Sequence, residues 1–212
     1  MQSGRSATNN EQLANAALVP VVYCEHGPAA LRSFLDSVHL DQSPNAVPLL
    51  AAAYARLLLG DMASVKELIA RALVAPDRPQ FAETWYARGE DPITSYRLDL
   101  AAAQLTLGDR PSAEKELDAV VAMVNQMIAD GVQRHATYEL RAKAYALKGQ
   151  GDAAMRDLDA AAKLGWRRVW WALHEPYFAS LRTRSDFQAL MRTVSESNEA
   201  LVAGLKAERT EI

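Results

Sequence analysis

Cysteine is almost absent from this sequence. The one cysteine, Cys24, allows no disulfide within the chain. A chain without disulfides fits the cytoplasm, and it does not exclude the periplasm, because a large helical domain needs no covalent cross-link. Zinc needs four well-placed ligands, and the histidines are scattered along the chain, at His26, His39, His135 and His174. We therefore expect no metal and no cofactor, and packing as the role of Cys24.

Long apolar runs and an excess of positive charge are also missing. The longest apolar run, residues 16–24, contains Pro20 and is too short to span a bilayer. Residues 1–10 are polar and lack the apolar core of a signal peptide. The net charge is −3, with Lys and Arg scattered among Asp and Glu. We expect a soluble chain without nucleic-acid or membrane contacts, cytoplasmic as given and periplasmic if it belongs to a membrane-anchored regulator.

Catalytic motifs are the third absence. The sequence has no G-x-S-x-G, no P-loop and no Rossmann fingerprint, and Gly149-Gln150-Gly151 is typical of a turn. Its Asp and Glu residues lie mostly at helix starts and on polar helix faces, so choosing two of them as an acid/base pair would be arbitrary. We expect a protein that is not an enzyme.

Helix-forming residues dominate what is present. Half of the residues are hydrophobic, alanine and leucine prevail, and β-branched runs are few, so the sequence predicts an all-α fold. We expect a disordered tail over residues 1–10 and a single domain over 11–212. The first helix covers residues 11–18 and ends at Pro20, residues 19–24 form a short strand or an extended connection, and a second helix follows Gly27.

Three helical hairpins with the same pattern are predicted for residues 46–74, 93–130 and 135–164. Their turn glycines are Gly60, Gly108 and Gly149. Small or aliphatic residues recur seven residues before each glycine and five, nine and twelve residues after it. These are Ala53, Ala101 and Ala142; Val65, Ala113 and Ala154; Ile69, Leu117 and Leu158; Ala72, Val120 and Ala161.

The pattern has a physical reason. Two antiparallel helices approach closely only where small side chains face each other, at the short end of the ~8–10 Å range of interaxial distances. Asp61 and Asp109 directly follow their turn glycines and Asp152 lies three residues after Gly149, and all three are placed to cap the second helices. A hairpin that cannot bury its apolar face alone must stack on the next one.

This pattern resembles the tetratricopeptide repeat. The match is best in the third hairpin, at Ala142, Tyr145, Gly149, Ala154, Leu158 and Ala161. The resemblance implies an α-solenoid whose first helices line a groove. The family's groove positions correspond here to Leu50, Tyr54 and Leu57, then Leu98, Ala102, Leu105 and Thr106, then Glu139, Lys143 and Ala146. Apolar burial would supply affinity there, and Tyr54, Glu139 and Lys143 would supply selectivity.

A second resemblance covers residues 166–206. Gly165-Trp166, Trp170-Trp171, Glu175-Pro176-Tyr177 and the segment after Asp186 resemble the C-terminal cap of tetratricopeptide domains in bacterial multidomain regulators, such as membrane-spanning winged-helix regulators, cyclases and kinases. The cap ends in a long terminal helix from about Ser185, which begins with the capping box formed by Ser185 and Gln188.

Four aromatic residues leave two interpretations open. Trp85 and Tyr86 lie in a long loop between the first two hairpins, while Trp170 and Trp171 lie in the cap. They would form a ligand pocket if they converged. Alternatively, the cap tryptophans cover the apolar end of the last hairpin.

These observations predict a non-catalytic interaction module, bacterial and regulatory, that acts as a scaffold in signalling. Its partner would be another protein, a peptide or a domain of the same polypeptide, held in the groove. The groove could equally be filled by the chain's own C-terminal helix, and the apolar ends of the stack make a homodimer plausible. The alternative is a small-molecule sensor domain of a bacterial signalling or transcription regulator.

Overall fold

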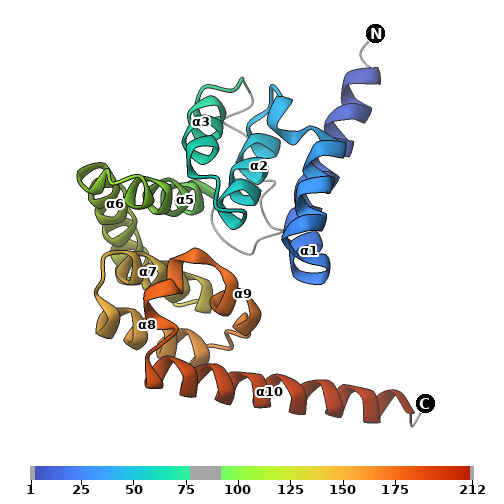
Figure 1. Cartoon of the computed structure of the whole chain (residues 1–212). Helices are drawn as coiled ribbons and strands as arrows, with labels where there is room; N and C mark the ends of the chain where they lie inside the picture. Colours follow the sequence, from blue (N-terminus) through green and yellow to red (C-terminus); the bar gives the residue numbers. More distant parts are fainter. Residues whose placement is uncertain (1–2, 77–91, 211–212) are drawn as a thin grey trace. The chain divides into compact units, whose positions relative to one another are not determined.

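The computed structural model describes residues 3–76 and 92–210, and every regular element within these two ranges is helical (Figure 1). The all-α prediction is confirmed for this part of the chain. The chain divides into two compact units, Met1–Glu116 and Leu117–Ile212, where we expected one domain over 11–212. The division falls inside helix α6, Arg110–Ala129. Within the described ranges, no helix combines the length and the hydrophobicity that a membrane span requires.

Unit 1 begins with α1, Ser3–Val38, which is interrupted at Gly27. Gly27 has φ 78° and ψ −173°, a backbone conformation that is accessible mainly to glycine. The expected break at Pro20 and the expected strand or extended connection at residues 19–24 are wrong, because the helix continues through them. Val19, beside the proline, is fully buried, and this packing compensates for the hydrogen bond that a proline removes. The expected disordered tail is also helical from Ser3, since extending an existing helix adds a hydrogen bond with each residue fixed.

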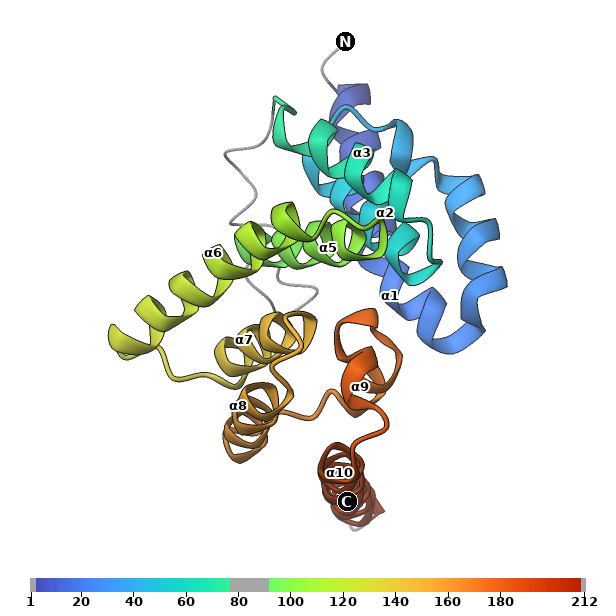
Figure 2. The same ribbon diagram turned by 60° about the vertical axis from the view of Figure 1, so that its left-hand side comes forward.

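Helix α2, Ala46–Leu58, forms the centre of unit 1. It packs against α1, against α3 (Met62–Leu73) and against α5 (Pro92–Thr106), and Figures 1 and 2 both show α1, α2 and α3 side by side. Nearly all of its side chains are buried. Such a helix is covered on every side, so its Ala-rich sequence reflects close neighbours all round rather than a single apolar face.

The three predicted turns share one backbone geometry. Gly60, Gly108 and Gly149 have φ of 80°, 83° and 75°. In each turn the residue after the glycine donates its N–H to a carbonyl five residues earlier, with distances of 2.9 Å from Asp61, 2.8 Å from Asp109 and 2.9 Å from Gln150. This is the Schellman ending of a helix, which satisfies carbonyls that the helix leaves without partners.

The N-cap after the turn of the third hairpin differs from the N-caps of the first two hairpins. The carboxylates of Asp61 and Asp109 accept hydrogen bonds from the N–H groups of Ser64 and Ser112, both at 3.3 Å, as expected of N-caps. The N-cap of α8, Gly151–Lys163, is Gln150, so the prediction of Asp152 as the third cap is wrong. Asp152 lies three residues after its glycine and not one, which places it inside the first turn.

The small-residue pattern inside the hairpins is confirmed. All twelve positions that we aligned on the turn glycines are buried, with at most 1 % of each side chain exposed. In the hairpin of α7, His135–Leu147, and α8, these positions belong to one core with the aromatic side chains of the cap. Close packing of this kind leaves no room for a larger side chain at the alanines.

Replacing Gly149 with alanine is expected to destabilise the protein by about 1–2 kcal/mol, because an L-residue is strained at this positive φ. Urea titration followed by circular dichroism measures the effect. The matched control is Gly204→Ala inside a helix, where alanine is favoured over glycine by about 0.5–1 kcal/mol. A Cβ would meet nothing within 4 Å at either position, so equal effects of the two changes would contradict the backbone explanation.

Unit 2 carries its cap after the α7–α8 hairpin. The cap covers residues 166–210 and contains α9 (Val169–His174), the 3-10 helix η4 (Pro176–Leu181) and α10 (Ser185–Thr210). Trp166, Phe178 and Phe187 are fully buried in the core that the cap shares with α7 and α8. Helix α7 packs against η4, while α10 packs against α8 and α9. In the third hairpin, η4 therefore covers α7, whereas the C-terminal helix α10 covers α8.

Arg184 fixes the start of α10. Its guanidinium group lies 2.8 Å from the carboxylates of both Asp152 and Asp186. The hydrogen bond to Asp186 raises the pKa of Arg184 and lowers that of Asp186. The capping contact of Gln188 differs from the expected capping box, since its side-chain amide donates to the carbonyl of Arg182 at 3.0 Å.

Candidate functional site

A cluster of buried charges joins α7 to the cap of unit 2. Lys143 and Glu175 are 0 % exposed and Glu139 is 2 % exposed. The ammonium nitrogen of Lys143 lies 3.0 Å from Glu175 Oε2 and 3.3 Å from Glu139 Oε1. It also lies 5.0 Å from the centre of the Tyr177 ring. Charges so deeply buried are tolerated only when they are paired, and Lys143 is paired with two carboxylates.

Two arginines complete this cluster from the cap. Arg168 Nη1 lies 3.5 Å from Glu139 Oε1, and Arg182 Nη2 donates to the backbone carbonyl of Glu175 at 2.5 Å. The two carboxylates are thus balanced by Lys143 and Arg168. Because Glu139 and Lys143 belong to α7 and the other groups belong to the cap, these contacts fix the cap's position on α7. We call these five residues the buried charge cluster.

The side of α9 opposite its buried residues, Val169 and Ala172, forms an aromatic surface. The rings of Trp170 and His174 are stacked at 4.2 Å, and Trp171 meets Trp170 edge-on at 4.7 Å. The guanidinium group of Arg168 lies 5.7 Å from the Trp171 ring. Both tryptophans are half-buried, and Leu173 and His174 are exposed. We call Arg168, Trp170, Trp171, Leu173 and His174 the α9 platform. Its side chains combine apolar area with hydrogen-bonding edges, the combination enriched at protein interfaces.

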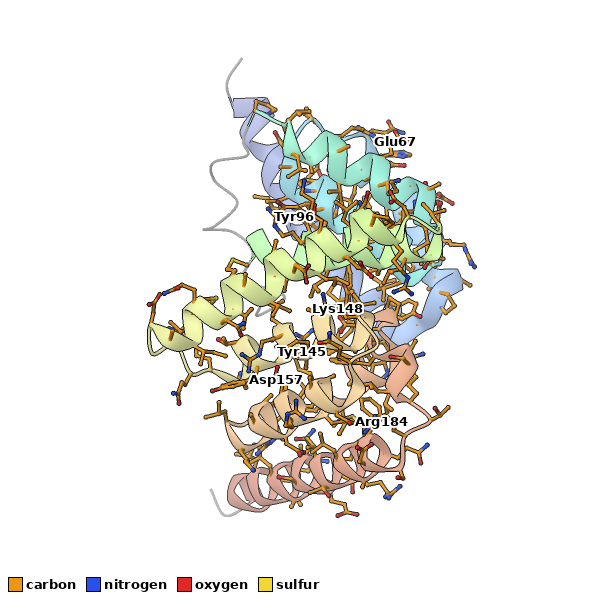
Figure 3. All side chains as sticks on the ribbon, turned by 90° about the vertical axis from the view of Figure 1, so that its left-hand side faces the viewer. Glu67, Tyr96, Tyr145, Lys148, Asp157 and Arg184 are labelled. Carbon is orange, nitrogen blue, oxygen red and sulfur yellow. The ribbon has the colours of Figure 1, made fainter. Side chains whose placement is uncertain are left out.

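Arg141 connects three helices on another face of unit 2. It makes two 2.7 Å hydrogen bonds to Asp157 of α8 and one of 2.6 Å to Asn125 of α6, and Asp157 raises its pKa. Its guanidinium group lies 5.8 Å and 5.9 Å from the rings of Tyr138 and Tyr145. Figure 3 labels Tyr145 and Asp157, which lie on the two helices of the hairpin. With every partner supplied by unit 2, this arrangement holds the hairpin to α6.

Most residues predicted to line a groove lie inside the protein. Leu50, Tyr54, Leu57 and Leu98 are buried in unit 1, where α1 packs against α2, and Glu139 and Lys143 are buried in unit 2. Thr106 is exposed and donates to the carbonyl of Ala102 at 2.9 Å. Sequence spacing assigned these residues to helix faces, but α1 and the cap are distant in sequence and decide which faces remain open.

The predicted pocket aromatics have different outcomes. Trp170 and Trp171 lie in the α9 platform, whereas Trp85 and Tyr86 lie outside the described residues, so their convergence is not tested. Glu175, Arg168 and Arg182 were missed as members of a site. The signal for Glu175 was its position between aromatic residues of a capping segment, since a carboxylate that becomes buried there needs a cationic partner.

The structure shows how the possible metal ligands and the one thiol are placed in the described ranges. Within residues 3–76 and 92–210, no three His, Cys, Asp or Glu side chains gather in a way that could hold a metal ion. Cys24 is exposed, so the expected packing role is wrong. Desolvation, with a smaller contribution from Glu25, raises the pKa of its thiol. A raised pKa leaves less of the reactive thiolate at neutral pH.

Comparison of this chain with protein-family models, with curated proteins and with solved structures found no match in any of the three.

Proposed function

We propose that this protein is a non-catalytic interaction module of tetratricopeptide-like hairpins that binds a protein or peptide partner through the α9 platform. The observation that supports it is the recurrence of one turn, at Gly60, Gly108 and Gly149, with the same buried small positions around it. Recurrent hairpins of this kind build stacked solenoids, whose common use is the display of a binding surface. The partner is another protein or a second domain of the same polypeptide.

The α9 platform is the favoured contact surface because the groove positions of the first and third hairpins are covered by the chain itself. Tryptophan and arginine are the residue types that most often dominate binding energy at interfaces, and the platform contains both. Its Leu173 is 41 % exposed and adds an apolar contact. Arg168 belongs to both the platform and the buried charge cluster, so the cluster holds the platform rigid, which reduces the entropy lost on binding.

The experiment is a selection of binding peptides from a random displayed library on the full chain, followed by affinity measurements with variants. Trp170→Ala is expected to weaken the selected peptides at least about tenfold, which corresponds to about 1.4 kcal/mol. The control is Val74→Ala, which alters an apolar side chain that is 83 % exposed and lies in the other unit.

Two results would count against the proposal. One is equal affinity of the Trp170→Ala and Val74→Ala variants for every selected peptide. The other is a failure to enrich any peptide, combined with a metabolite that raises the melting temperature of the wild-type chain but not of the Trp170→Ala variant. That second result would support the small-molecule sensor instead, since a ligand stabilises the folded state by mass action.

A further inference from the structure

Helix α10 has one apolar stripe, of which only the first part is covered. Phe187, Met191 and Val194 share one face of the helix at intervals of four and three residues, and all three are buried in the core of unit 2. The same intervals continue along the helix through Asn198 to Leu201 and Leu205. Asn198 donates to the carbonyl of Arg167 at 3.1 Å, and every side chain from Glu199 to Lys206 is exposed.

The uncovered part is markedly apolar. Leu201, Val202 and Leu205 are 58 %, 49 % and 55 % exposed. They lie within about 100° of one another around the helix, which places them on the face that Phe187 and Val194 use for packing. Figure 1 shows the C-terminal end of α10 extending beyond the other helices of unit 2. A helical end of about 12 residues is marginal in water by itself, so a covering surface would stabilise it.

The charges beside these apolar residues indicate which surface covers the C-terminal end of α10. Glu199 and Lys206 lie on the same flank of the stripe, next to Val202, and both are exposed. They are seven residues apart, about 10 Å along the helix axis, too far for a close ion pair with each other. In an antiparallel pair of identical helices with its two-fold axis near residues 202 and 203, Glu199 of each copy lies opposite Lys206 of the other copy. The apolar residues of both copies then meet between two ion pairs.

We infer that the C-terminal end of α10 is a self-association surface that pairs antiparallel with α10 of a second copy of this chain. The interface is isologous, as in most homodimers, since each residue pair occurs twice. Apolar burial of Leu201, Val202 and Leu205 supplies the affinity. The Glu199–Lys206 pairs select the antiparallel orientation and this register.

The test is sedimentation equilibrium of the full chain from about 1 μM to about 1 mM, the range of dissociation constants for weak to moderate dimers. The wild-type mass is expected to rise toward twice the monomer mass. Leu205→Glu should weaken the dimer at least about tenfold, because it introduces a charge at the apolar centre. The matched control, Ala203→Glu, adds the same charge on the opposite face of α10 and should leave the dissociation constant unchanged within about twofold.

A charge exchange tests the orientation. Glu199→Lys places like charges opposite Lys206 of the second copy and should weaken the dimer, and the double variant Glu199→Lys/Lys206→Glu should restore it at the wild-type net charge. A wild-type chain that stays monomeric throughout the concentration range would overturn the inference, as would a double variant that dimerises no better than Glu199→Lys alone. The same holds if Leu205→Glu and Ala203→Glu have equal effects.

Discussion

Replacing Lys143 with methionine is expected to lower the free energy of unfolding by about 3–5 kcal/mol, the usual cost of removing one partner from a buried ion pair. The methionine side chain fills most of the volume of lysine but leaves the carboxylates of Glu139 and Glu175 in the interior without their shared cation. Both carboxylates are almost completely buried, so water cannot replace the ammonium group. Urea unfolding followed by circular dichroism measures the loss.

Lys148→Met is the matched control, because it removes the same charge from an ion pair at the surface. Lys148 pairs with Asp118, whose side chain is 69 % exposed, and surface pairs contribute about 0–1 kcal/mol. Adding Glu175→Gln to Lys143→Met should recover part of the stability, since one unpaired buried charge is then removed. If Lys143→Met costs no more than Lys148→Met, the buried charge cluster does not fix the cap on α7.

Replacing Trp166 with alanine is expected to have the second large effect, a decrease of about 3–5 kcal/mol in the free energy of unfolding. Trp166 is fully buried, and it belongs to the core in which side chains of α7, α8, η4 and α10 meet. The change removes a large apolar surface from this core and leaves a cavity that the surrounding helices can only partly close. Against a typical total stability of about 5–15 kcal/mol, such a loss would unfold a substantial fraction of unit 2 under mild denaturation.

Trp170→Ala serves as the control for this experiment, since it truncates the same residue type four positions later on the half-exposed α9 platform. A surface truncation of this kind is expected to cost about 1 kcal/mol or less. Thermal and urea unfolding of both variants give the comparison. Equal losses would mean that the cap is held mainly by α9 and not by the core around Trp166. The two variants also distinguish a loss of peptide binding from a loss of folding, because only Trp170→Ala is expected to reduce peptide affinity without unfolding unit 2.

The positions of the hairpins were predictable from the sequence because their causes are local. A glycine at positive φ ends each first helix, and an N-cap residue starts the next helix directly after it. The alanines at positions 53, 101 and 142 recur at a fixed distance from these glycines, and side chains so small can be predicted to lie where helices approach closely. The all-α class follows from the same kind of reasoning, because helix propensity is a local property.

What the tertiary structure alone decided is which helix faces stay open. Pro20 indicated a helix end, yet packing around Val19 keeps α1 helical until Gly27. Glu139 and Lys143 looked like polar groove residues, yet a segment about 30 residues later supplies Glu175 and encloses them. The sequence determined the helices and turns of the three hairpins, because hydrogen bonding and backbone conformation there depend on near neighbours. The covering of α2 by α1 and of α7 by the cap depends on contacts between distant segments, which no local pattern specifies.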